Sequence, residues 1–144
     1  MVKPFETESV RTERRILVTI QAPIVDVDRI ISHVTTVTPL IVGKYDSNVF
    51  VSASGIERYR PLAGAAAGFE PDVRQRPEIV EISFELDDDE TLVSDVTEAI
   101  FYIHSYEEPV IRIAHILSSR SKGLDDKANP NRWWNTTGDW KQPA

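Results

Sequence analysis

The chain has 144 residues, a formal net charge of −7 and no cysteine. These values predict a single acidic domain and exclude disulfides, thiolate metal sites and a cysteine nucleophile. With 16 basic residues against 23 acidic ones, general binding to nucleic acid is disfavoured. No segment has the pattern of a signal peptide or the length of a membrane span, so we expect a cytoplasmic protein without membrane contact.

The sequence divides into three parts. Residues 1–13 are charged and lack apolar periodicity, which predicts a flexible lead-in. Residues 14–117 carry the regular hydrophobic patterns and predict the folded domain. Residues 118–144 contain glycine and proline without an apolar period, which predicts an irregular tail.

The first half of the domain predicts a strand, a helix and a hairpin. Residues 15–21 alternate between apolar and polar side chains, as a half-buried strand does. Apolar residues at helical spacing over 27–37 predict a helix. The segments 45–52 and 56–60 are separated by Ser54-Gly55 and predict a β-hairpin.

The second half repeats this order after a loop over 61–71. Residues 79–86 alternate again and predict a strand. Asp87, Asp88 and Asp89 are cap candidates for a helix that runs to Ile103. Residues 110–117 predict the last strand.

We summarise this order as βαββαβ, an α+β ferredoxin-like sandwich with one antiparallel sheet and two helices on one face. The opposite face of the sheet would hold Leu17, Ile79 and Ile116. Because such apolar side chains need cover, we expect a second subunit to pack on that face.

Two separated motifs resemble a known family. Residues 41–47 (IVGKYDS) and 59–64 (YRPLAG) resemble the G-N-Y-D-x-C … F-R-P-x-x-G signature of the domain inserted in YqfO proteins of the Nif-three-like family. Residues 104–109 (HSYEEP) resemble the H-P-Y-E-E-P motif of that family, which CutA shares as H-P-Y-E-V-P. Ser105 stands where the family has proline. The resemblance covers about residues 14–117.

The resemblance implies a free-standing CutA-like or PII-like domain, a class that commonly forms trimers with ligand clefts between subunits. The dinuclear metal centre of YqfO proteins does not carry over, because its ligands lie in flanking segments. This chain has only three histidines, His33, His104 and His115.

The motif residues supply two candidate sites. Tyr45, Asp46, Arg60 and Tyr106 are candidates for binding a small polar or anionic ligand between subunits, with Arg60 making forked contacts. For Asp46 the alternative is to close its own backbone turn. His104, Glu107 and Glu108 are candidates for binding a divalent metal. The alternative is that His104 caps the end of a helix and that Pro109 makes the motif a helix-to-strand corner.

The tail holds all three tryptophans of the chain, Trp133, Trp134 and Trp140. Three indoles in water are unfavourable, so we expect the tail to dock on its own domain or on a neighbouring subunit and to contribute oligomer contacts. Recognition of a separate protein partner is the alternative.

Together these features favour a non-enzymatic, oligomeric binding or regulatory module, most simply a homotrimer, with a small-molecule ligand. A divalent-metal-binding CutA-like protein, an adaptor acting through the tail, and a metal-dependent hydrolase using His104 remain as alternatives. The sequence has no G-x-S-x-G elbow and specifies no catalytic triad or cofactor.

Overall fold

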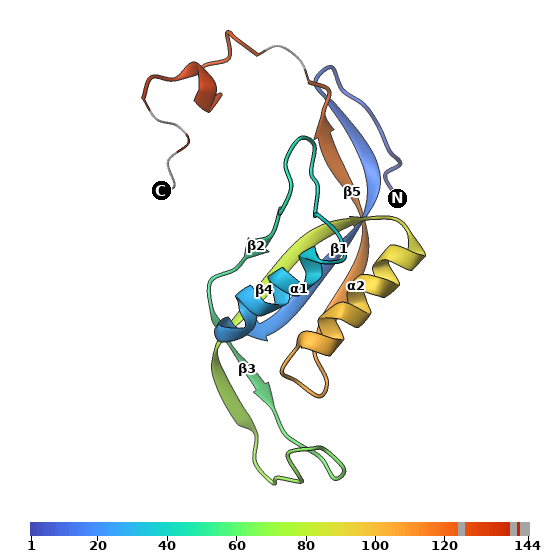
Figure 1. Cartoon of the computed structure of the whole chain (residues 1–144), viewed down its shortest axis with the longest axis vertical. Coiled ribbons are helices and arrows are strands. Elements are labelled where there is room, and N and C mark those ends of the chain that lie inside the picture. Colours follow the sequence, from blue (N-terminus) through green and yellow to red (C-terminus); the bar gives the residue numbers. More distant parts are fainter. Residues whose placement is uncertain (124–125, 139–140, 142–144) are drawn as a thin grey trace.

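The fold is organised around β1 (Val10–Pro23), which lies in the interior of an antiparallel sheet in the computed structural model (Figure 1). The structure describes residues 1–123, 126–138 and 141. β1 pairs on one side with β4 (Arg74–Asp87) and on the other with β5 (Ile111–Ser121). The sheet has five strands in the order β2-β4-β1-β5, and β3 also pairs with β4. The predicted α+β class with an antiparallel sheet is confirmed, but over the described residues the order of elements is βαβββαβ, with one strand more than the predicted βαββαβ.

Both helices cover the same face of this sheet. A short 3-10 turn, η1 (Ile24–Asp26), leads from β1 into α1 (Val27–Thr35), and α2 (Glu90–Ile103) connects β4 to β5. The buried core consists of alternate residues of β1 and β4 and the inner residues of both helices. Its members include Ile16, Val18, Ile20, Ala22, Ile30, Val34, Val80, Ile82, Phe84, Leu86, Val96 and Ile100. Period-two alternation in the strands therefore identified the core faces correctly.

The predicted β-hairpin between 45–52 and 56–60 is wrong. β2 (Phe50–Val51) and β3 (Gly55–Tyr59) do not pair with each other, and both pair with β4. They follow one another along the same edge of β4, with a register irregularity after Gly55. The reason is that β4 has 14 residues and offers backbone groups along its whole length.

Three strands are longer than their apolar patterns predict. β1 begins at Val10, inside the segment expected to be a flexible lead-in, β4 begins at Arg74, and β5 continues to Ser121. The extension pairs residues 10–13 with residues 118–121. Apart from Val10, its side chains are polar or charged on both strands, so the pairing depends on backbone hydrogen bonds that leave no hydrophobic signature.

The sheet face opposite the helices carries a network of charged side chains. Glu85 accepts hydrogen bonds from Arg120 (3.0 Å) and Ser118 (2.7 Å), and its carboxylate lies 3.4 Å from Arg15 Nε. Both arginines are buried, with Arg15 also paired to Asp87. The predicted apolar residues of this face are present, but they share it with an ion-pair network that links three strands.

The structure selects Asp89 as the N-cap of α2. Its carboxylate accepts a hydrogen bond from the Leu92 backbone N–H at 3.0 Å. We expect Asp89→Ala to lower the free energy of unfolding by about 1 kcal/mol, because a helix-end donor loses its partner. Urea unfolding measures the change, and Asp88→Ala is the matched control. Equal effects of the two substitutions would contradict the cap assignment.

The tail contains a second 3-10 turn, η2 (Trp133–Asn135), and lies apart from the sheet and helices (Figure 1). Trp133 is 70% exposed and Trp134 is 53% exposed. Neither indole is covered by the domain of its own chain, so docking on a neighbouring subunit or another partner stays a prediction. Trp140 lies outside the described residues. Among the described helices, none is both long and apolar enough to cross a membrane.

Candidate functional site

The HSYEEP motif forms the corner between α2 and β5, and His104 holds this corner to β1. The imidazole is buried, with Nε2 2.8 Å from the Gln21 carbonyl oxygen. Its Nδ1 accepts a hydrogen bond from the Tyr106 backbone N–H at 3.0 Å. Because Nδ1 is the acceptor, Nε2 carries the proton and donates it to the carbonyl. His104 is the C-cap residue of α2, with its backbone N–H donating to the Ile100 carbonyl at 2.9 Å, while its imidazole fixes the corner to β1.

Ser105 provides a second anchor for the same corner. Its hydroxyl donates a hydrogen bond to the carboxylate of Asp26, at the end of η1. Asp26 is buried, and Arg29 pairs with it at 2.9 Å. A buried carboxylate requires such partners. At the position where the resembled family has proline, this chain thus uses a side-chain hydrogen bond.

Tyr106 projects from the corner into a cluster with Arg76 of β4 and two residues of β3. Its hydroxyl donates a hydrogen bond to Glu57 at 2.6 Å. The Arg76 guanidinium lies over two aromatic rings, 4.5 Å from the centroid of Tyr106 and 4.6 Å from that of Tyr59. Arg76 also donates hydrogen bonds to Glu57 (3.3 Å) and to the Tyr59 hydroxyl (2.8 Å). Cation–π contacts and ion pairing together fix these four side chains.

The environment of Tyr106 keeps its hydroxyl protonated. Partial burial and the hydrogen bond to the negatively charged Glu57 raise the pKa of Tyr106 to about 12, against an opposing effect of Arg76. At neutral pH Tyr106 is consequently a hydrogen-bond donor and cannot act as a general base.

Glu107 ties the loop between β3 and β4 to the corner. Both of its carboxylate oxygens accept the Ala66 backbone N–H, at 3.0 and 3.1 Å. Gly64, two residues earlier, has φ +94°, a conformation that side chains other than glycine rarely adopt. The small-residue loop 64–68 is therefore held in place by a carboxylate.

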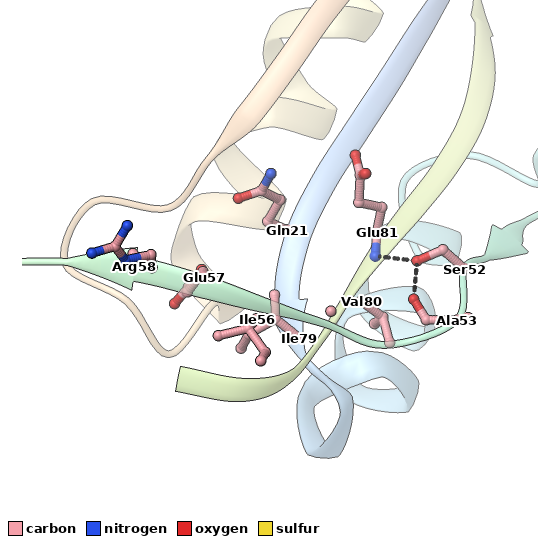
Figure 2. A pocket seen from close by; sticks show the side chains of 10 residues that line it. Gln21, Ser52, Ala53, Ile56, Glu57, Arg58, Ile79, Val80 and Glu81 are labelled. Carbon is pink, nitrogen blue, oxygen red and sulfur yellow. Dashed lines mark hydrogen bonds between the residues drawn. The ribbon is translucent and has the colours of Figure 1, made fainter. Parts of the chain in front are cut away.

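These elements enclose a cleft with a cavity volume of about 480 Å³. Its walls come from β3, the start of β4, the loop after β3, and the α2–β5 corner. The lining includes Glu57, Arg58, Tyr59, Pro61, Ala65, Arg76, Tyr106, Glu107 and Glu108. A neighbouring hollow of about 370 Å³ shares Gln21, Glu57 and Arg58 with it and continues toward Ser52 and Glu81 (Figure 2).

The predicted ligand residues do not all meet in one chain. Tyr106 lines the cleft, whereas Arg60 lies in the adjoining loop, 5.9 Å over the Phe69 ring. Tyr45 is exposed in a tight turn with Val42, beyond the far end of the β4 edge. Asp46 accepts a hydrogen bond from Ser47 at 3.0 Å. The loops that hold Arg60 and Tyr45 lie at opposite ends of that edge (Figure 1), so a site containing both would need a second subunit.

The predicted metal ligands are not arranged around one point. Both ring nitrogens of His104 are engaged, Glu107 binds Ala66, and Glu108 is exposed. Within residues 1–123, 126–138 and 141, no group of three His, Asp or Glu side chains is placed to hold a metal ion. Within one chain, His104, Glu107 and Glu108 are therefore not placed to hold one metal ion together.

Sequence reasoning missed Glu57, Tyr59 and Arg76 as cleft residues. Arg76 lies in a segment without apolar alternation, directly before Pro77, which resembles a loop. Tyr59 belongs to the YRPLAG motif, from which Arg60 was selected because arginine makes forked contacts. The signal that could have found them is the cross-strand register Glu57↔Arg76, and a sequence alone does not show it.

An antiparallel sheet with two helices on one face and this corner defines a CutA-like α+β fold. Known structures agree with that class. A Bacillus cereus protein related to NIF3 superposes with a TM-score of 0.59 and 18% identity over 79% of this chain. CutA1 from Shewanella sp. SIB1 gives a TM-score of 0.53 with 14% identity, covering 71% of this chain and 80% of that protein. CutA1 from Ehrlichia chaffeensis gives 0.51 and 17%, covering 78% and 86%.

These likenesses confirm the resemblance inferred from the motifs, and at such identities they establish the fold alone. The chain spans only 27% of the NIF3-related protein. No protein-family model matches the sequence, and no curated protein does.

Proposed function

We propose that this protein is a self-associating, non-catalytic module that binds a small polar ligand in the cleft at the α2–β5 corner. The observation that carries the proposal is the cluster of Tyr59, Arg76 and Tyr106 around Glu57. It joins chain segments that are far apart in sequence into one wall of a cleft of about 480 Å³. Ligand sites of this kind combine a preformed hollow with a few fixed polar groups.

The chemistry of the cleft favours binding over catalysis. Tyr106 stays protonated at neutral pH, because its pKa is raised to about 12. The guanidinium of Arg76 is always charged and Glu57 is already paired with it. Such groups orient a ligand through hydrogen bonds and charge, and among the described cleft residues none forms a nucleophile–base pair.

Self-association is supported by the free face of the sheet. The helices cover one face only, and Phe50 on the edge strand β2 is 69% exposed. Phe50 pairs with Ser83, so it projects from the face opposite the helices. A large apolar side chain beside a sheet face without its own cover is typical of a contact between subunits. The resemblance to CutA-like proteins favours a trimer for that contact.

Native mass spectrometry of protein purified without chelator tests both parts of the proposal in one experiment. We expect an assembled species that retains additional mass from a small ligand. We expect Tyr106→Phe to lose that mass or retain it at a reduced fraction, because the hydrogen bond to Glu57 that shapes the cleft wall is removed.

The matched control is Tyr102→Phe, since Tyr102 is 77% exposed on the outer side of α2. It removes the same hydroxyl without touching the cleft. Equal retention of ligand by the Tyr106→Phe variant and wild type would refute the cleft as the binding site. A bare monomer in the wild-type spectrum would refute the self-association.

A further inference from the structure

The tail contains a segment that is organised by its own hydrogen bonds. Arg132 Nε pairs with the Asp126 carboxylate at 2.7 Å. The Asn135 side-chain amide donates hydrogen bonds to the carbonyl oxygens of Asp126 (2.6 Å) and Asn129 (2.8 Å). Thr136 caps the Trp133 carbonyl at 2.6 Å. We refer to residues 126–138 as the tryptophan segment, because this framework presents Trp133 and Trp134 outward.

The two exposed indoles lie in a part of the chain whose charge differs from the rest. Residues 126–138 contain Lys127 and Arg132 against the single acidic residue Asp126, whereas residues 1–117 contain 11 Lys or Arg and 20 Asp or Glu. Tryptophan and arginine are the residues most enriched among the dominant contacts of protein interfaces. A segment with two exposed indoles and a small net positive charge therefore complements an acidic surface with an apolar floor.

Such a surface is present between α2 and β5. A groove of about 520 Å³ is lined by Glu90, Val93, Ser94, Asp95, Thr97, Glu98 and Ile113. Ile113 is 47% exposed and Val93 is half-buried, so the groove has an apolar floor. Glu90, Asp95 and Glu98 surround that floor with negative charge.

We propose that the tryptophan segment of one copy binds in the α2–β5 groove of a second copy, with the indoles on Val93 and Ile113 and the basic residues near the three carboxylates. The tail leaves β5 after Ser121, and Ile113 lies eight residues back along the same strand. Figure 1 places the tail beyond the end of β5 that is remote from α2, which favours a groove on another molecule.

This contact goes beyond the sheet-face association proposed above, because it uses different surfaces. It is heterologous: each copy gives its tail to one neighbour and accepts the tail of another. Contacts of this type form a closed ring when the rotation that relates one copy to the next is a whole fraction of a full turn. In such a ring each tail would link one subunit to the next.

Intrinsic tryptophan fluorescence tests the proposal without a label, since all three tryptophans of the chain lie in the tail. We expect the full-length protein to show emission at shorter wavelength and protection from acrylamide quenching when light scattering reports an assembly. On dilution to monomer, the emission should shift to the wavelength of solvent-exposed indole.

Glu98→Lys places a positive charge at the rim of the groove on an exposed helix position. We expect it to shift the emission of the assembled protein to longer wavelength and to restore quenching, because it repels the basic tail. Asp72→Lys makes the same change of charge in an exposed loop away from the groove and should leave the emission unchanged. Trp133→Ala with Trp134→Ala should raise the dissociation constant of the tail contact about tenfold or more.

Four results would overturn the proposal. If light scattering shows an assembly but the tryptophan emission is that of solvent-exposed indole, the tail contact is refuted. The proposed sheet-face association is not affected by that result. Protected indoles in a monomer place the tail on its own chain. If the indoles are protected from quenching and Glu98→Lys does not change that protection, the tail binds a surface other than the α2–β5 groove. A protein that is monomeric with solvent-like emission at every concentration contradicts both the tail contact and the self-association.

Discussion

Replacing Glu85 by alanine is expected to lower the free energy of unfolding by about 3 kcal/mol. Glu85 accepts hydrogen bonds from Arg120 and Ser118 and pairs with Arg15. Both guanidinium groups are buried, so removing the carboxylate leaves two buried charges with fewer partners. Breaking a buried ion pair costs about 3–5 kcal/mol. We expect the lower end of that range because 23% of the Glu85 side chain is exposed.

Urea unfolding at neutral pH measures this effect, and Glu81→Ala is the matched control. Glu81 lies on the same strand and the same face, and its side chain is exposed. A loss from Glu85→Ala no larger than that from Glu81→Ala would contradict the proposed role of the ion-pair network.

The contribution of Glu85 should also depend on pH. Burial alone would raise the pKa of this carboxyl, but hydrogen bonds from Ser118 and Arg120 and the charges of both arginines together lower it below its ordinary value. A lowered pKa in the folded state means that the stabilisation is complete above the unfolded-state pKa of about 4.3 and is lost as pH falls through the folded-state value. The difference between wild type and Glu85→Gln should therefore shrink below about pH 4.

Replacing Phe50 by aspartate is expected to weaken the sheet-face contact between subunits about 30-fold, and so to raise the protein concentration needed for assembly. Phe50 is 69% exposed on the sheet face that lacks helices, and it pairs with Ser83 at the edge of the sheet. Loss of a large apolar anchor at an interface typically costs 2 kcal/mol or more, which corresponds to about 30-fold weaker association for each contact. A carboxylate on the same face adds the cost of removing a charge from water.

Light scattering across a dilution series gives the mass of the wild type and of this variant. Phe101→Asp is the control, since Phe101 is 51% exposed on α2 and not on the sheet face. Unchanged urea unfolding of the variant would show that the single chain remains folded. A dissociation constant of the assembly that Phe50→Asp leaves unchanged would place the contact between subunits on another surface.

The hydrophobic pattern alone predicted much of this fold. The alternation around Ile16, Val18 and Ile20, and again around Ile82 and Phe84, identified the buried faces of the two central strands. A side chain that must leave water appears at a fixed period in the sequence, because the pleat of a strand sends alternate residues to opposite faces. The same argument placed both helices on the core.

Strand pairing was predicted less well. β2 and β3 were expected to form a hairpin, but each pairs with β4, whose first residues, from Arg74 to Glu78, carry no apolar alternation. Backbone hydrogen bonds depend little on side-chain type. Whether a strand pairs with its neighbour in sequence or with a distant strand therefore depends on all the strand edges that are available in the fold.

The sequence by itself determined the core faces, the helices, the corner motif and the resemblance that the CutA-like fold confirms. Only the tertiary structure decided that Arg76 lies between Tyr59 and Tyr106, that His104 bonds to β1, and that Glu85 joins two buried arginines. Along a strand or a helix the buried apolar side chains recur at a fixed period, so the sequence of that one segment is enough to identify its buried face. Contacts between polar side chains from distant segments depend on register and on the path of each loop, and these are set only when the whole sheet forms.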